Sequence, residues 1–220
     1  MIVSIGNWVI HEACRQLRQW HLQGHPDWSV AVNLSALQFE QSNLVETVVD
    51  ALAKHQIPAE LLTLEVTETT AMRDPDESVR ILTELTQLGV KASIDDFGTG
   101  YSSLLYLKRL PASELKIDRA FVNELQHQKE DATIVSAIVA LAQSLQLKVV
   151  AEGVETAEQQ AFLTSLGCNT LQGYLLGKPV PPERVPDLAN FVVPETEAAM
   201  ANVSPMTEAD QPLTPQVAVI

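Results

Sequence analysis

The chain has 220 residues, and its 14 lysines and arginines face 28 aspartates and glutamates, so its net charge is −14. Hydrophobic residues make up 46%, enough for a sizeable core and too many for a wholly disordered chain. An acidic surface repels nucleic acid backbones and anionic lipids, which argues against a basic-patch binder and predicts no contact of this segment with nucleic acid or membrane.

Short β-branched runs alternate with amphipathic helical stretches along most of the chain. Apolar residues from Val9 to Trp20 recur at helical spacing, and Gly24 with Pro26 ends this first helix. We expect strands at 30–34, 61–66, 91–94, 114–117, 148–151 and 170–174. We expect further helices at 43–55, 76–88, 131–145, 156–166 and 183–191, and a short apolar segment at 104–107.

Such alternation predicts an α/β fold of parallel strands joined by helical crossovers, in either a (β/α) barrel or an open doubly wound sheet. The six expected strands are two fewer than a complete barrel has. No GxGxxG or phosphate-loop motif follows the first strand, which weakens the nucleotide-binding sheet.

The ends of the chain and the cysteines indicate its surroundings. Cys14 and Cys168 form neither a metal-type pair nor a disulfide framework, which favours a reducing compartment. The N-terminus lacks a signal-peptide pattern and the longest uncharged run is short of a membrane span, so we expect a cytoplasmic segment. From Val192 onward the chain is rich in proline and acids and has no lysine or arginine. We therefore expect one domain over residues 1–191 and a disordered acidic tail over 192–220.

Polar side chains follow almost every expected strand at its carboxyl end. They are Asn33, Glu65, Asp95 with Asp96, Lys116 with Asp118, Glu152 and Gln172. In a parallel barrel these ends meet on one face, where active sites are built. A single acid after a strand is most often a helix cap, but capping prefers Ser, Thr, Asp and Asn and does not account for six successive strands.

The oxygen-rich character of this set predicts a metal site. Converging carboxylates repel one another unless their pKa values rise or cations bind. An all-oxygen donor set suits Mg²⁺ or Mn²⁺, whereas zinc favours His or Cys. The adjacent Asp95 and Asp96 would let one carboxylate bridge two cations about 3.5–4 Å apart, the geometry of two-metal phosphoester hydrolysis. We interpret the small-residue loop at 97–103, which follows directly, as coupled to the metal or the substrate.

Six motifs then appear in order along the chain. They are VNLS at 32–35, LEVTET at 64–69, DDFGTGYSSL at 95–104, LKIDR at 115–119, AEGVET at 151–156 and LQGY at 171–174. Together they resemble the EAL-domain phosphodiesterases that hydrolyse bacterial cyclic di-GMP, over roughly residues 3–191. The resemblance implies a TIM-like barrel, a requirement for two Mg²⁺ or Mn²⁺ ions, and cleavage of one phosphodiester bond to give linear pGpG.

The same resemblance assigns roles to single residues. The implied metal ligands are Asn33, Glu65, Asp95, Asp96 and Glu152, with Asp95 bridging the two metals. Lys116 would contact the attacking water, and Glu152 would act near it as general base. Gln172, Asp118 and Arg119 would serve substrate binding, while Glu68 and Glu155 would stabilise loops at the rim of the site.

The sequence also departs from the family. The name-giving Glu-Ala-Leu motif lies on an earlier strand than any found here, so we expect a partial barrel of about six strands. We favour an incomplete product of a longer reading frame over a natural truncation, because a partial barrel exposes unpaired strand edges. An upstream sensory or GGDEF domain, a membrane anchor on the parent protein and a homodimer belong to this expectation. Two alternatives stay open: a non-catalytic receptor for cyclic di-GMP, and an inactive fragment.

Overall fold

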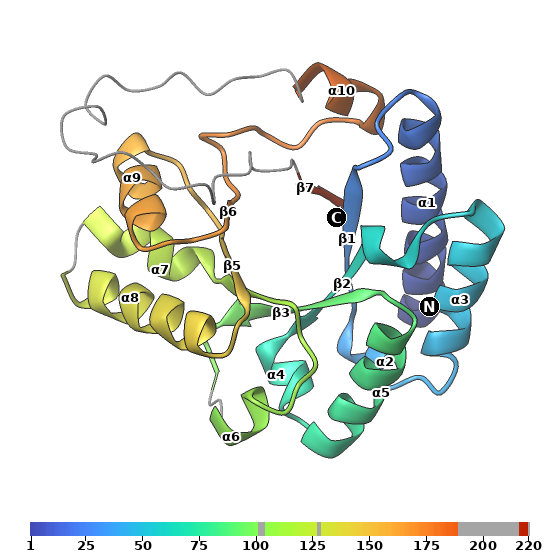
Figure 1. Ribbon diagram of the computed structural model, residues 1–220, viewed down its shortest axis with the longest axis horizontal. Coiled ribbons are helices and arrows are strands. Elements are labelled where there is room, and N and C mark those ends of the chain that lie inside the picture. Colours follow the sequence, from blue (N-terminus) through green and yellow to red (C-terminus); the bar gives the residue numbers. More distant parts are fainter. Residues whose placement is uncertain (101–103, 127–128, 189–215, 220) are drawn as a thin grey trace.

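The computed structural model describes residues 1–100, 104–126, 129–188 and 216–219, and its strands form one curved parallel sheet (Figure 1). The strands are β1 (Ser29–Asn33), β2 (Leu62–Thr67), β3 (Lys91–Phe97), β4 (Glu114–Ile117), β5 (Lys148–Ala151), β6 (Thr170–Leu171) and β7 (Gln216–Val219). Their order in the sheet is β6-β5-β4-β3-β2-β1-β7. The six expected strands are thus confirmed, and with their helices they form a partial TIM-like α/β barrel.

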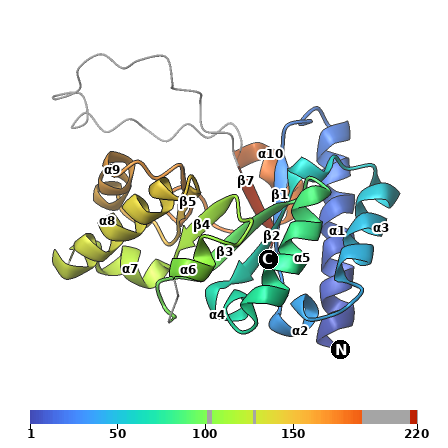
Figure 2. The same cartoon turned by 60° about the horizontal axis from the view of Figure 1, so that its bottom comes forward.

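Helices connect successive strands and cover the outer side of the sheet (Figures 1 and 2). The longer helices are α1 (Ile2–Leu22), α3 (Leu44–His55), α5 (Pro75–Gln87), α8 (Lys129–Ser144) and α9 (Ala157–Ser165). The short helical segments are α2 (Ala36–Phe39), η1 (Ala59–Leu61), α4 (Glu68–Ala71), α6 (Leu104–Leu107), α7 (Arg119–Asn123), η2 (Glu124–Gln126), η3 (Pro182–Arg184) and α10 (Val185–Leu188). The helices that surround β1 to β3 and those that surround β4 and β5 form two groups (Figure 2).

Three short helices that follow strands were not expected from the sequence. Each begins at a side-chain cap: Ser35 accepts from the backbone N–H of Gln38, Thr67 from that of Thr70, and Asp118 from that of Ala120. Such caps satisfy the free N–H groups of the first turn. A helix of four or five residues is too short to show a helical period, so the cap is its one local signal.

The two faces of the sheet differ in chemistry. On β2, Leu62, Leu64 and Val66 alternate with Thr63 and Glu65, and all five are buried. Because successive side chains on a strand point to opposite faces, the apolar set lies against the helices and the polar set lines the concave side. The polar lining continues with Ser93 and Asp95 on β3 and with Glu114 and Lys116 on β4, all less than a tenth exposed. The concave side of the sheet therefore carries the polar chemistry.

The end of the chain differs in part from expectation. Within the expected helix at 183–191 the structure has η3 followed by α10 up to Leu188, and residues 189–191 lie outside the described residues. Gln216–Val219, which belong to the tail expected to be disordered, form β7 and pair in parallel with Ser29–Val32 of β1. The outer edge of β1 has free N–H and C=O groups, with which a short apolar segment can pair. A composition averaged over the whole tail does not reveal such a segment. The rest of the tail up to 215 lies outside the described residues, so its disorder and the domain boundary stay predictions.

The segment after β6 returns to the first helix. Indole Nε1 of Trp20, near the end of α1, donates to the carbonyl oxygen of Pro182 at 3.2 Å. The ribbon between β6 and α10 runs across to α1 (Figure 1). Within the described residues, none of the helices combines the length and the apolar character that crossing a bilayer requires.

Candidate active site

Four neighbouring strands bring three acidic side chains and one buried lysine together. Nζ of Lys116, on β4, lies 2.8 Å from Oε2 of Glu65, 3.2 Å from Oδ1 of Asp95 and 2.6 Å from Oε1 of Glu152. The Lys116 side chain is 4% exposed, and these carboxylates are between 5% and 19% exposed. Buried charges of this kind persist because each is paired and hydrogen-bonded.

A β-bulge places both carboxylates of the Asp95–Asp96 pair on the concave side. Ile94 pairs with Leu115 and Phe97 pairs with Ile117, so two residues of β3 lie opposite the single Lys116 of β4. Asp96 adopts a left-handed backbone conformation with φ 53°, and its N–H donates to Oδ1 of Asp95 at 3.0 Å. In a regular strand the two neighbours would point to opposite faces, and the bulge redirects the second.

The pKa directions reflect crowding of like charges in a buried place. Burial raises the pKa of Glu65 even though Lys116 favours its ionised form. For Asp96, burial, the charge of Asp95 and a hydrogen bond with Asp118 raise the pKa to about 6. Burial disfavours the charged ammonium of Lys116, but Glu65 and the other nearby carboxylates outweigh this and raise its pKa. Lys116 therefore favours its charged form, and the three carboxyl groups paired with it outnumber this one ammonium.

The donor set fits a divalent cation. Asp95, Asp96 and Glu152 each offer a carboxylate oxygen, and these oxygens lie within 4.8 Å of one another. Carboxylate oxygens are the ligands of Mg²⁺ and Mn²⁺, and additional positive charge would relieve the repulsion that raises the pKa of Asp96. The geometry thus supports an acidic metal site at the carboxyl ends of β3 and β5.

The loop after β3 is held by an acid from the preceding crossover. Oε2 of Glu68, the first residue of α4, accepts from the N–H of Gly98 at 2.7 Å, and Glu68 is 1% exposed. Gly98 has φ +100°, and a Cβ there would lie 2.8 Å from the Phe121 ring. Glu68 therefore contacts the loop that the family resemblance assigns to it, and its role in the site stays a prediction; residues 101–103 of the expected loop lie outside the described residues.

The segment after β5 packs against the loop after β6. The N–H of Val154 donates to the carbonyl oxygen of Gln172 at 3.0 Å, and the N–H of Gln172 donates to that of Ala151 at 2.8 Å. A Cβ on Gly173 would lie 2.1 Å from the Val154 oxygen, so the close approach requires glycine. This packing fixes the backbone that follows Glu152.

The remaining expected residues lie around the cluster with fewer contacts. Asn33 pairs in register with Glu65, at the carboxyl end of β1, and its side chain is exposed. Asp118 caps α7 through a 2.6 Å bond from the N–H of Ala120. The side chains of Arg119, Glu155 and Gln172 are exposed near the site. The structure places these residues at the same end of the sheet, and their roles toward substrate or metal stay predictions.

Gln159, a buried residue on α9, was not predicted from the sequence. Its side-chain oxygen accepts from the backbone N–H groups of Glu155 and Thr156 at 2.8 and 3.0 Å. With Thr156 Oγ1, which accepts from the N–H of Gln159 at 3.2 Å, this forms a capping box. The Thr-x-x-Gln spacing after β5 was the signal that could have revealed it.

Comparison with known proteins decides the family. A family model described as EAL domain matches residues 1–179. The chain belongs to the EAL domain family. Among curated relatives, this EAL domain is 65% identical over 185 residues to the bifunctional diguanylate cyclase/cyclic di-GMP phosphodiesterase MucR of Pseudomonas aeruginosa, covering 84% of this chain and 27% of MucR. The chain thus spans about a quarter of the length of that relative.

This EAL domain also resembles solved structures of other proteins in its three-dimensional fold. The MucR phosphodiesterase in complex with c-di-GMP matches with a TM-score of 0.82 and 65% identity, over 84% of this chain and 74% of that one. A manganese/cy-diGMP complex of Klebsiella pneumoniae BlrP1 matches with a TM-score of 0.72 and 30% identity, over 80% of this chain and 45% of that one. The family assignment therefore rests on sequence and fold together.

Proposed function

We propose that this EAL domain hydrolyses cyclic di-GMP to linear pGpG with the help of Mg²⁺ or Mn²⁺. The observation that carries the proposal is the cluster of Asp95, Asp96 and Glu152 oxygens within 4.8 Å, next to the buried ammonium of Lys116. The complexes of MucR with c-di-GMP and of BlrP1 with manganese and cy-diGMP support it by relationship.

The charges of the site explain why a cation is needed. Glu65, Asp95 and Glu152 surround one ammonium, and the Asp96 carboxylate lies close by. An anionic phosphodiester entering this excess of negative charge would be repelled. Bound divalent cations would neutralise the phosphate and make water more acidic. Asp95, Asp96 and Glu152 would hold them, with Glu65 and Asn33 as the further oxygen ligands that the family resemblance implies.

The chain's own residues then divide the work of hydrolysis. Water adds across one P–O3′ bond: its oxygen bonds to phosphorus, the O3′ oxygen leaves, and a proton from solvent completes the new hydroxyl. Glu152 accepts the proton that the attacking water releases. Because Lys116 stays protonated, its role is to orient the water and Glu152 and to stabilise developing negative charge rather than to act as a base.

Residues around the acidic cluster would bind the substrate, and other domains would act as partners. Gln172, Asp118 and Arg119 would contact the cyclic dinucleotide, and Glu68 and Glu155 would order the loops around it. A neighbouring diguanylate cyclase domain in a longer protein is proposed by analogy with the printed name of MucR. Homodimerisation through α7 and the loop after Asp96 stays a prediction.

The decisive experiment is a hydrolysis assay on the purified chain. Cyclic di-GMP is incubated with the protein and Mn²⁺, Mg²⁺ or a chelator, and the products are separated by chromatography. We expect pGpG with either metal and none with chelator. Glu152→Gln should abolish turnover while leaving some binding, because the amide cannot accept the proton from water.

The matched control is Glu158→Gln, which removes the same charge from an exposed position on α9. It should hydrolyse like the unaltered chain. Full activity of Glu152→Gln would contradict the general-base role. Tight cyclic di-GMP binding without product, measured by calorimetry on a cooperatively folding sample, would instead establish the receptor alternative; neither binding nor product would establish the inactive fragment.

A further inference from the structure

The amide of Gln159 joins two segments that both come from the site. Its oxygen accepts from Glu155 and Thr156, at the end of the loop that begins with Glu152. Its nitrogen Nε2 donates to the carbonyl oxygen of Val122, on α7, at 3.0 Å. The side chain is 4% exposed, so each of these polar contacts replaces water that is excluded.

A helix cap alone does not require the contact with Val122. In a capping box the residue at this position has only to accept from the backbone, and glutamate does so as well as glutamine. Donation to a carbonyl oxygen requires the N–H of the amide, and an ionised carboxylate would repel that oxygen. The contact therefore explains why the residue is Gln rather than Glu.

The two joined segments also meet at a second point. A Cβ at Gly153 would lie 2.6 Å from Cβ of Arg119, the first residue of α7, and Gly153 has φ +72°. The loop that follows Glu152 thus lies against α7 at Gly153, and Gln159 binds the same helix one turn further on. Because α7 begins directly after Asp118, the contacts of Gly153 and Gln159 with α7 influence the positions of both Glu152 and Asp118.

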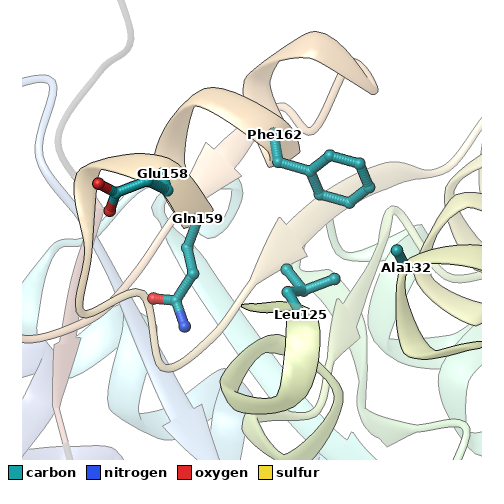
Figure 3. A pocket seen from close by; sticks show the side chains of 5 residues that line it. All are labelled: Leu125, Ala132, Glu158, Gln159 and Phe162. Carbon is teal, nitrogen blue, oxygen red and sulfur yellow. The ribbon is translucent and has the colours of Figure 1, made fainter. Parts of the chain in front are cut away.

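Gln159 lies beside a small cavity between α9 and the segment that follows α7. The cavity has a volume of about 220 Å³ and is lined by Leu125, Ala132, Glu158, Gln159 and Phe162. Figure 3 shows Phe162 pointing toward Ala132, Gln159 pointing away from α9, and Glu158 pointing in another direction. This space beside the amide leaves few neighbouring atoms to take over its hydrogen bonds when the amide is removed.

We propose that Gln159 is a positioning residue that holds the Glu152 loop against α7 and so keeps Glu152 at the metal site. This inference rests on the proposed function, because that function gives Glu152 its role at the metal site. The contacts of Gln159 are nevertheless measured without any turnover. Gln159→Glu keeps the capping box and loses the bond to Val122, whereas Gln159→Leu loses both. Gln160→Glu adds the same charge at the next, half-buried residue, which takes no part in these bonds.

The first measurement is hydrogen–deuterium exchange of the metal-free chain. Both Gln159 variants should exchange about fivefold faster at the amides of α7 and of residues 153–155, because a hydrogen bond of ordinary net strength is lost. Thermal unfolding midpoints should lie below that of the unaltered chain for both variants, because each loses the bond to Val122, and Gln159→Leu loses its half of the capping box as well. Gln160→Glu should match the unaltered chain in both.

The second measurement is Mn²⁺ affinity by calorimetry. We expect both variants to bind Mn²⁺ about 10-fold more weakly, the effect typical of losing a group that orients a metal ligand. In an active preparation kcat should fall while KM stays the same. If Gln159→Glu exchanges and binds Mn²⁺ like the unaltered chain, Gln159 is only a cap and the proposal is wrong. Absence of hydrolysis by the unaltered chain would overturn the proposed function, while exchange and Mn²⁺ affinity would still decide the role of Gln159.

Discussion

The ammonium nitrogen of Lys116 lies 2.6 Å from Oε1 of Glu152, so a lysine on β4 is paired directly with the carboxylate that follows β5. The same nitrogen reaches Glu65 on β2 and Asp95 on β3. A single cation thus holds the carboxyl ends of neighbouring strands together. In the absence of metal, the stability of this end of the sheet should depend on it.

Lys116→Met tests this dependence with a side chain of similar length. Removing the ammonium leaves Glu65 and Asp95 buried without a counter-ion, which should lower the free energy of unfolding by about 3–5 kcal/mol at neutral pH. The loss should be smaller near pH 5, because burial raises the pKa of Glu65 and its carboxyl takes up a proton more readily once the ammonium is gone. Urea unfolding of the metal-free chain measures both.

The control for this variant is Lys148→Met, on an exposed position of β5. It should change the free energy of unfolding by no more than about 0.5 kcal/mol. Equal midpoints for the two variants would show that the buried pairing contributes nothing. Added Mn²⁺ should narrow the gap between Lys116→Met and the unaltered chain, because a divalent cation can balance the same carboxylates.

Asp96→Asn should stabilise the metal-free chain while weakening its metal binding. Burial and the charge of Asp95 raise the pKa of Asp96 to about 6 from a usual 3.8, so its ionised form is disfavoured in the folded state. With allowance for solvent screening, we expect a gain of about 1 kcal/mol at pH 7.5, or roughly 3 °C in the unfolding midpoint. Asn tolerates the left-handed backbone at this position, so the substitution adds no strain.

The pH dependence of this gain has a definite direction. Above pH 6 the folded chain carries the ionised Asp96 and its full repulsion. As the pH falls through 6 toward 3.8 the folded-state carboxyl takes up a proton, so the advantage of Asp96→Asn should disappear. Asp27→Asn, at an exposed position, should show no such pH-dependent difference. A constant gain from pH 7.5 to 4 would contradict a raised pKa of Asp96.

Gly173→Ala tests the packing of the loop after β6 on the loop after β5. The added Cβ would lie 2.1 Å from the Val154 oxygen, so the backbone must shift, at a cost of about 1–3 kcal/mol. Because Val154 lies two residues after Glu152, Mn²⁺ affinity should fall as well. Gly177→Ala is the matched control, since its Cβ would have its nearest neighbour at 4.0 Å. Unfolding and calorimetry on both variants decide whether this contact fixes the site.

The helical and strand periods were enough to predict the six parallel strands and the longer helices. The carboxyl-end positions of Glu65, Asp95, Lys116 and Glu152 followed from the same pattern, because parallel strands bring these ends together. The short helices α2, α4 and α7 were missed, since their formation depends on single caps and on tertiary packing. Two-residue β6 is shorter than the expected strand because Thr170 and Leu171 pair in register with β5, whereas Gln172 already bonds to Val154 beyond the end of that strand.

The sequence by itself therefore determined the α/β class, the face of the sheet that carries the acids, and their suitability for a hard divalent cation. Only the tertiary structure decided that a bulge turns Asp95 and Asp96 toward the same side, and that Lys116 pairs with acids from three other segments. It also decided that Gln159 bonds to Val122 and that β7 lies beside β1. The physical reason is sequence range. Periodicity and capping act over a few neighbouring residues, whereas these contacts join residues 20 to 187 positions apart, and their distance in space depends on how the whole sheet curves.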